Sequence, residues 1–167
     1  MVKPGTRFLT LIGWLAFASS MAPSPSTHAR CSSLLKPLRL RGGGYTLGIR
    51  DSIMIAHSFR GAEFGPAQRM HGATYTVDME LSVDELTPRL NWVIDIGAAT
   101  TMLKEVLSKY NYRNLDEMFG EANSTTEFMC KEIFDQLKER LKGGIKGSLT
   151  IKLHESHIAW ASYTEKI

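Results

Sequence analysis

Four histidines follow residue 44 of this 167-residue chain: His57, His71, His154 and His157. Neutral imidazole is among the commonest protein ligands of zinc. His57 ends one β-rich segment and His71 begins the next. If these segments are antiparallel neighbours joined by a short loop, both imidazoles come within reach of one metal ion. Two histidines at strand ends also fit ordinary hydrogen-bonded or solvent-facing side chains, so the residues alone leave both interpretations open.

The segments that would position these histidines have the pattern of β-strands. Residues 45–59, "YTLGIRDSIMIAHSF", are β-rich, and residues 60–69, with two glycines and a proline, predict a loop. From Met70 to Val83 apolar and polar residues alternate strictly, which predicts a half-buried strand. One face of that strand carries Ala73, Tyr75, Val77, Met79, Leu81 and Val83.

Helical periodicity follows in the middle of the chain. The short apolar run "NWVIDI" predicts a strand that ends at Asp95, and a helix is predicted from Gly97 to Tyr110. A second helix is predicted to start at Ser124, because Ser124 and Glu127 have the spacing of a capping box.

The last segment, residues 148–163, alternates again and predicts two strands around a turn near Glu155 to His157. The element order ββααββ predicts an α+β domain over residues 45–167, with both helices on one face of an antiparallel sheet. Such a sheet keeps two edges and one open face, which predicts a homo-oligomer whose sheets close into a shared barrel.

Residues 1–44 have the composition of a targeting leader. Lys3 and Arg7 precede a short apolar core, and a Ser-, Pro- and Arg-rich stretch without acidic residues follows. A signal-like segment before a transit-like segment favours an organelle, with the plastid first and secretion or the mitochondrion as alternatives. The apolar core is too short for a comfortable membrane span, so no membrane association is expected after leader removal.

The positive net charge of +3 comes from this leader. All 17 acidic residues lie from Asp51 onward beside 13 Lys and Arg, so residues 51–167 carry −4 and do not predict a nucleic-acid partner. The two cysteines, Cys31 and Cys130, show no metal-binding or disulfide spacing.

Several motifs together resemble one family. "AHSF", then "HGATYTV", "VIDI" before a helix, "NYRNLDE", "STTEFMCKEIFDQL" and "IKLHES" are similar, in order and spacing, to the 6-pyruvoyltetrahydropterin and 6-carboxytetrahydropterin synthases. The resemblance covers Ser52 to about Tyr163. It implies the tunnelling fold (T-fold), assembly into trimers or hexamers with sites between subunits, and a pterin ligand.

The resemblance also implies a zinc ion bound by one histidine of the first strand and two of an HxH motif. His57 and His71 match two of these ligands, whereas Ala73 occupies the third position. A catalytic zinc ion normally has three protein ligands. His157 is the preferred replacement, because its strand parity matches that of Glu155, and Glu63 in the loop is the alternative.

The family's catalytic pair is also changed in this chain. Ala67 stands where the family has its cysteine, and Tyr112 aligns with the catalytic histidine. Neither residue can take a proton from carbon at neutral pH as a thiolate–imidazole pair does, because alanine has no acid–base group and a phenol has a pKa near 10. Tyr112 and Asp116 are the catalytic candidates that the resemblance leaves.

The pterin-binding positions match the family better. Glu155 corresponds to the glutamate that anchors the aminopyrimidine ring through two parallel N–H bonds. Thr125 and Thr126 match a motif at a helix start, and Arg113 is a candidate for an anionic substrate arm. We therefore expect a lyase that acts on 7,8-dihydroneopterin triphosphate or a related pterin. The alternative is a non-catalytic T-fold protein that binds a pterin, a purine-like ligand or a partner.

Overall fold

The computed structural model describes residues 44–167, and the predicted leader lies outside this range apart from Gly44. The elements are β1 (Tyr45–His57), the 3-10 helix η1 (Ala62–Gln68), β2 (His71–Val83), α1 (Ile96–Leu107), β3 (Arg113–Asn114), α2 (Leu115–Phe119), α3 (Thr126–Leu141), β4 (Ser148–His154) and β5 (Trp160–Lys166). No helix within the described residues is long and apolar enough to cross a membrane.

The five strands form one sheet in the order β3-β1-β2-β4-β5. All neighbours are antiparallel except β3, a two-residue strand parallel to β1. β1 and β2 pair without interruption from Tyr45 opposite Val83 to His57 opposite His71. Because side chains alternate between the faces of a strand, this register sends the apolar residues of β2 to one face.

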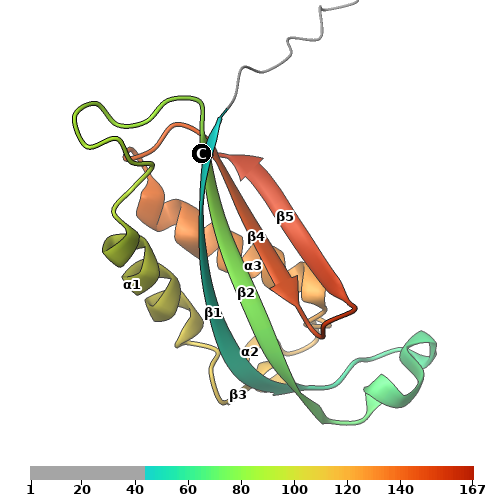
Figure 1. The fold of residues 1–167 in the computed structure, drawn as a ribbon. Coiled ribbons are helices and arrows are strands. Elements are labelled where there is room, and N and C mark those ends of the chain that lie inside the picture. Colours follow the sequence, from blue (N-terminus) through green and yellow to red (C-terminus); the bar gives the residue numbers. More distant parts are fainter. Residues whose placement is uncertain (1–43) are drawn as a thin grey trace, which may run out of the picture. The chain divides into compact units, whose positions relative to one another are not determined.

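That face is covered by α1 and α3; in Figure 1, α3 lies behind the strands and α1 lies beside β1. The core between the layers contains buried side chains from both, including Tyr75, Met79 and Leu81 of β2, Leu103 and Val106 of α1, Ile133, Phe134 and Leu137 of α3, and Leu149, Ile151 and Leu153 of β4. The predicted α+β class and the placement of the helices on one face are confirmed.

The predicted strand over "NWVIDI" is wrong. Trp92 to Ile94 form a bend, and Ile96 is already the first residue of α1. Asp95 is the N-cap of α1, where its Oδ1 accepts a hydrogen bond from the Ala98 N–H at 2.7 Å. Val93 and Ile94 are half-buried and pack against the core from this loop. A short apolar run therefore marked a buried loop here, because burial alone does not distinguish a strand from a loop.

The start of α3 differs from the prediction by one residue. Thr125 is the N-cap, and its Oγ1 accepts a hydrogen bond from the Phe128 N–H at 3.3 Å. Ser124, the predicted cap, is fully buried and lies against His57 instead. Thr125 caps the helix in place of Ser124, because the Ser124 hydroxyl contacts His57.

The opposite face of the sheet has no helix on it within the described residues and carries a polar network. Arg50 donates two hydrogen bonds to the Asp78 carboxylate at 2.6 and 2.8 Å, and His154 Nε2 lies 3.1 Å from the same carboxylate. Arg50 and His154 lower the pKa of Asp78 through these hydrogen bonds. Closure of this open sheet into a barrel of several copies stays a prediction.

Candidate metal centre

His57 is the last residue of β1 and is completely buried. Its Nδ1 lies 3.2 Å from both the carbonyl oxygen and the hydroxyl oxygen of Ser124. A carbonyl only accepts, so the bond to it requires Nδ1 to carry the proton, which leaves the lone pair on Nε2. His57 Nε2 is buried and has no hydrogen-bond partner.

His71 is the first residue of β2 and lies directly opposite His57 in the register. The two ring centroids are 4.5 Å apart. His71 Nδ1 lies 2.9 Å from the Arg69 carbonyl oxygen, so it is the donor, and Nε2 again keeps the free lone pair. Each imidazole is therefore oriented by a backbone carbonyl, the arrangement that metal-binding histidines commonly have.

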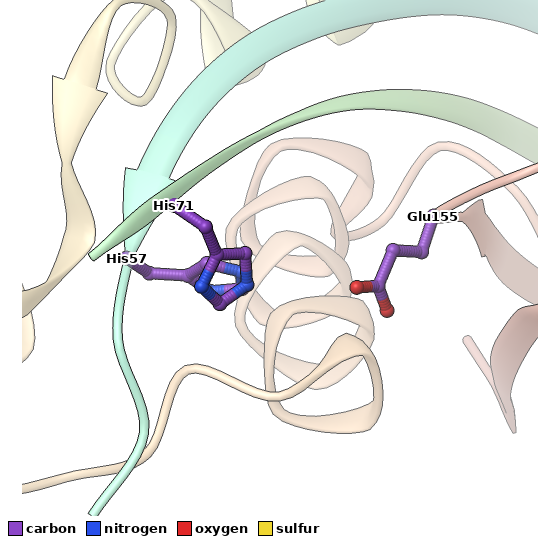
Figure 2. Close-up of side chains that lie close together, drawn as sticks. All are labelled: His57, His71 and Glu155. Carbon is purple, nitrogen blue, oxygen red and sulfur yellow. The ribbon is translucent and has the colours of Figure 1, made fainter. Parts of the chain in front are cut away.

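Glu155, the residue directly after β4, is the third member of the cluster. Its carboxylate points toward the two imidazoles (Figure 2), and one ligand atom from each of the three side chains lies within 4.8 Å of the others. Glu155 Oε2 accepts a hydrogen bond from Thr126 Oγ1 at 2.8 Å. Thr126 therefore fixes the carboxylate through one oxygen and leaves the other oxygen without a side-chain partner.

Aromatic side chains surround the histidine pair. Phe59 packs edge-on against His57, with ring centroids 4.7 Å apart, and Phe64 packs against Phe59 at 4.9 Å. Tyr75 lies on the core side of His57, at 6.0 Å between centroids and 80° between planes. Apolar surroundings of this kind restrict water and strengthen electrostatic interactions at the site.

The donor set fits a zinc ion. Burial, followed by the charge of His71, lowers the pKa of His57, which favours the neutral imidazole that binds metal. Two histidines and a carboxylate form a known ligand set for catalytic zinc, with bonds of about 2.0–2.2 Å and ligand atoms therefore about 3.3 Å apart. The separation of 4.8 Å or less is compatible with binding after small side-chain adjustments.

Comparisons with known proteins agree with this architecture. Residues 46–166 match the family model described as 6-pyruvoyl tetrahydropterin synthase. The chain belongs to the 6-pyruvoyl tetrahydropterin synthase family. Since the matched residues span β1 to the end of β5, the whole described domain is the family domain.

Several solved structures have the same fold as this chain. The 6-pyruvoyl tetrahydropterin synthase of Caenorhabditis elegans is 24% identical, with a TM-score of 0.64 over 75% of this chain and 98% of the nematode chain. The Plasmodium falciparum 6-pyruvoyl tetrahydropterin synthase is 17% identical, with a TM-score of 0.63 over 75% of this chain and all of the other. An uncharacterized protein of Wolinella succinogenes, WS1659, is 14% identical, with a TM-score of 0.54 over 73% of this chain and 98% of the other. At these identities the likeness shows the fold.

His157, the preferred third ligand from the sequence, lies apart from this cluster. It is exposed in the turn between β4 and β5 and lines a hollow with Arg50, Thr74, Thr76, His154 and Ser156. The parity that aligned it with Glu155 is interrupted because β4 ends at His154 and the Glu155 N–H donates to the Ala159 carbonyl across the turn. Glu63, the alternative, is exposed in η1 and does not belong to the cluster.

Tyr112 and Arg113 also lie away from the cluster in this single chain. Tyr112 is 76% exposed, and its N–H donates to the Met54 carbonyl at 2.7 Å. Both residues line a shallow hollow at the β1 edge together with Met54 and Asn114. Tyr112 adopts φ 58°, a left-handed conformation that is uncommon for a large side chain.

Asp116 and Thr125 have structural contacts beside the centre. Asp116 accepts hydrogen bonds from the Ser58 N–H at 3.0 Å and the Ser58 hydroxyl at 2.6 Å, so both carboxylate oxygens hold the residue that follows His57. Thr125 caps α3. A contact that the sequence did not predict joins the same segments: Asn123 exchanges two hydrogen bonds with the backbone of Arg60 at 2.7 and 2.9 Å.

No free thiol lies in the cluster among residues 44–167. Ala67 is in η1, where its carbonyl accepts from the Phe59 N–H. Cys130 is buried in α3, its Sγ lies 3.4 Å from the Ala161 carbonyl, and burial raises its pKa to about 11. Cys130 is therefore a protonated core residue and does not substitute for the proton-accepting cysteine that the resemblance implies.

Proposed function

We propose that this chain is a zinc-dependent pterin lyase that acts on 7,8-dihydroneopterin triphosphate or a closely related pterin. The observation that carries the proposal is the unpartnered Nε2 of buried His57, a residue that clusters with His71 and Glu155 within the family fold. A buried polar atom without a partner is costly, so its presence beside two further ligand groups supports a bound ion.

The ligands of the proposed ion are His57 Nε2, His71 Nε2 and one oxygen of Glu155. When bound, zinc supplies a Lewis acid that polarises a substrate hydroxyl or carbonyl oxygen. Ser124 and the Arg69 carbonyl hold the two imidazoles in the required tautomers, while Thr126 holds the carboxylate. The aromatic residues Phe59 and Phe64 shield the histidine pair from solvent.

Glu155 has two possible roles at this centre. The family resemblance assigns it to the aminopyrimidine ring, which uses both carboxylate oxygens. In this chain Thr126 already donates to Oε2, and the carboxylate is directed at the histidines. These contacts favour Glu155 as the replacement for the metal ligand that Ala73 cannot provide.

A second candidate function is non-catalytic binding of a pterin. This function is favoured because none of three candidate residues is suited to proton transfer. Ala67 cannot act as a base, Cys130 is buried in the core, and both Asp116 oxygens hold Ser58. In this case the metal and Glu155 would retain a pterin without converting it.

Turnover separates the two functions. The full chain is loaded with zinc and incubated with 7,8-dihydroneopterin triphosphate, and pterins are separated and identified by mass. A lyase converts the substrate to a new pterin, and metal-free protein does not. Saturable pterin binding without any new product would support the binding function, and absence of both binding and turnover would contradict both.

A gain-of-ligand variant tests the placement of the metal. Ala73→His restores an HxH pair on the strand face that carries His71, since residues two apart share a face. We expect the zinc Kd to fall at least about tenfold, because a third imidazole joins the ligand set. The Kd is measured by competition with a chromophoric chelator.

Thr74→His is the matched control for this variant. Thr74 is exposed and points to the opposite face of β2, so its imidazole cannot reach the cluster. Its zinc Kd should equal that of the unmodified chain. If folded Ala73→His binds zinc no more tightly than Thr74→His, the ion does not lie between His57 and His71.

A further inference from the structure

Two buried side-chain polar atoms have no hydrogen-bond partner among residues 44–167: His57 Nε2 and the Tyr75 hydroxyl. They belong to neighbouring rings, whose centroids are 6.0 Å apart. Nearly all buried polar groups in proteins are paired. A single group bound between these two side chains would satisfy both atoms.

The backbone register places Tyr75 beside the carboxylate of the cluster. Thr76 pairs with His154 at the end of β4, so the next residues along the two segments are Tyr75 on β2 and Glu155 just after β4. Tyr75 also shares a strand face with His71, and only the small side chain of Ala73 stands between them on that face. Tyr75 thus lies near His57 and Glu155 and on the same strand face as His71.

The surroundings favour Tyr75 as a hydrogen-bond donor. Its side chain is completely buried, and burial together with the carboxylates of Glu155 and Glu127 raises the pKa of its hydroxyl. Glu155 follows β4, and Glu127 lies in the first turn of α3. A neutral phenol in such a setting donates to an oxygen lone pair rather than accepting a proton.

We propose that Tyr75 is an additional binding residue of this site, whose hydroxyl donates a hydrogen bond to an oxygen atom of the group held by His57, His71 and Glu155. That oxygen belongs to water when zinc alone is bound, and to a hydroxyl or carbonyl of the ligand otherwise. The inference rests on the proposed metal centre, and it adds a donor that neither Ala67 nor Tyr112 supplies there. An oxygen-bearing ligand is therefore selected over an apolar one.

The test is Tyr75→Phe in the full chain, with metal removed by a chelator and zinc then titrated back. Removing an unpaired hydroxyl is neutral or stabilising, so the Tm of the metal-free variant should equal or exceed that of the unmodified chain. The zinc Kd should rise about tenfold, the lower end of the effect of losing an outer hydrogen bond at a metal site.

Tyr110→Phe is the matched control. Tyr110 is 2% exposed, and its hydroxyl donates to Glu132 Oε1 at 3.0 Å on the α1–α3 side of the core. Loss of this satisfied bond should lower the metal-free Tm and leave the zinc Kd unchanged. The two tyrosines are therefore expected to show opposite patterns in the same pair of measurements.

Three outcomes would overturn the inference. A metal-free Tm that falls in Tyr75→Phe as it does in Tyr110→Phe would show that the hydroxyl is already bonded inside the protein. An unchanged zinc Kd in Tyr75→Phe, with normal binding by the unmodified chain, would refute the role of Tyr75 and leave the metal centre intact. Absence of zinc binding by the unmodified chain would refute the metal centre itself, and the inference with it.

Discussion

His57→Ala is expected to weaken zinc binding roughly 100-fold to 1,000-fold. Four-ligand zinc sites have apparent binding free energies of about 10–16 kcal/mol, or about 2.5–4 kcal/mol for each ligand. His57 is the only proposed ligand that is completely buried, and its free Nε2 has no other partner. Isothermal titration or chelator competition on the full chain measures the change in Kd.

Two other histidines serve as controls for this variant. His154→Ala removes an imidazole that lies against Asp78 on the open sheet face, and His157→Ala removes one from the exposed β4–β5 turn. Both should bind zinc as the unmodified chain does. A large loss in His157→Ala would instead support the ligand assignment made from the sequence, and equal losses in all three variants would show that the effect is not local.

The loss of zinc binding in His57→Ala should be distinguishable from unfolding of the domain. His57→Ala leaves the Ser124 carbonyl and hydroxyl without their imidazole partner, so some loss of metal-free stability is expected as well. Circular dichroism and the Tm of the metal-free variant show whether the domain is still folded at the titration temperature. A folded variant with an unchanged zinc Kd would rule out His57 as a ligand.

Gly147→Ala is expected to destabilise the domain by about 3 kcal/mol, the upper part of the range for overpacking a well-packed site. A Cβ at this position would lie 2.1 Å from the Ser82 carbonyl oxygen and 3.1 Å from Val83 Cγ1. The clash is with backbone at the end of β2, so relief requires a strand to move. Gly147 also exchanges two backbone hydrogen bonds with Ile167.

Gly48→Ala is the matched control for the glycine variant. Gly48 lies in β1, and a Cβ there would meet nothing within 4 Å. Its unfolding free energy should stay within about 1 kcal/mol of the unmodified chain, since alanine reduces the freedom of the unfolded state. Urea unfolding followed by circular dichroism measures the unfolding free energy of both glycine variants. Similar stabilities for the two variants would contradict the close approach at Gly147.

The sheet and the histidine pair could be predicted because both depend on local periodicity. Strict alternation from Met70 to Val83 specifies which face of β2 is buried, and His57 and His71 meet because their two strands pair in one unbroken register. The helical segments were predicted in the same way from periodic apolar stripes. These elements need no information from distant parts of the chain.

The segment "NWVIDI" and the third ligand could not be predicted by such rules. Val93 and Ile94 are apolar because a loop packs them against the core, and a six-residue run does not distinguish that from a strand. His157 was favoured because strand parity was extended beyond His154, where β4 in fact ends. Glu155 joins the histidines through contacts between elements far apart in sequence, including the bond from Thr126.

The unbroken pairing of β1 with β2 also determines how the molecule can be attached to a surface. β1 runs from Tyr45 to His57, about 40 Å at the rise of an extended strand. Ile167 bonds with Gly147, just before β4, whereas Glu155 follows the other end of β4 (Figure 1). A tag or immobilising linker fused after Ile167 would therefore attach the domain at the end opposite the three proposed ligands.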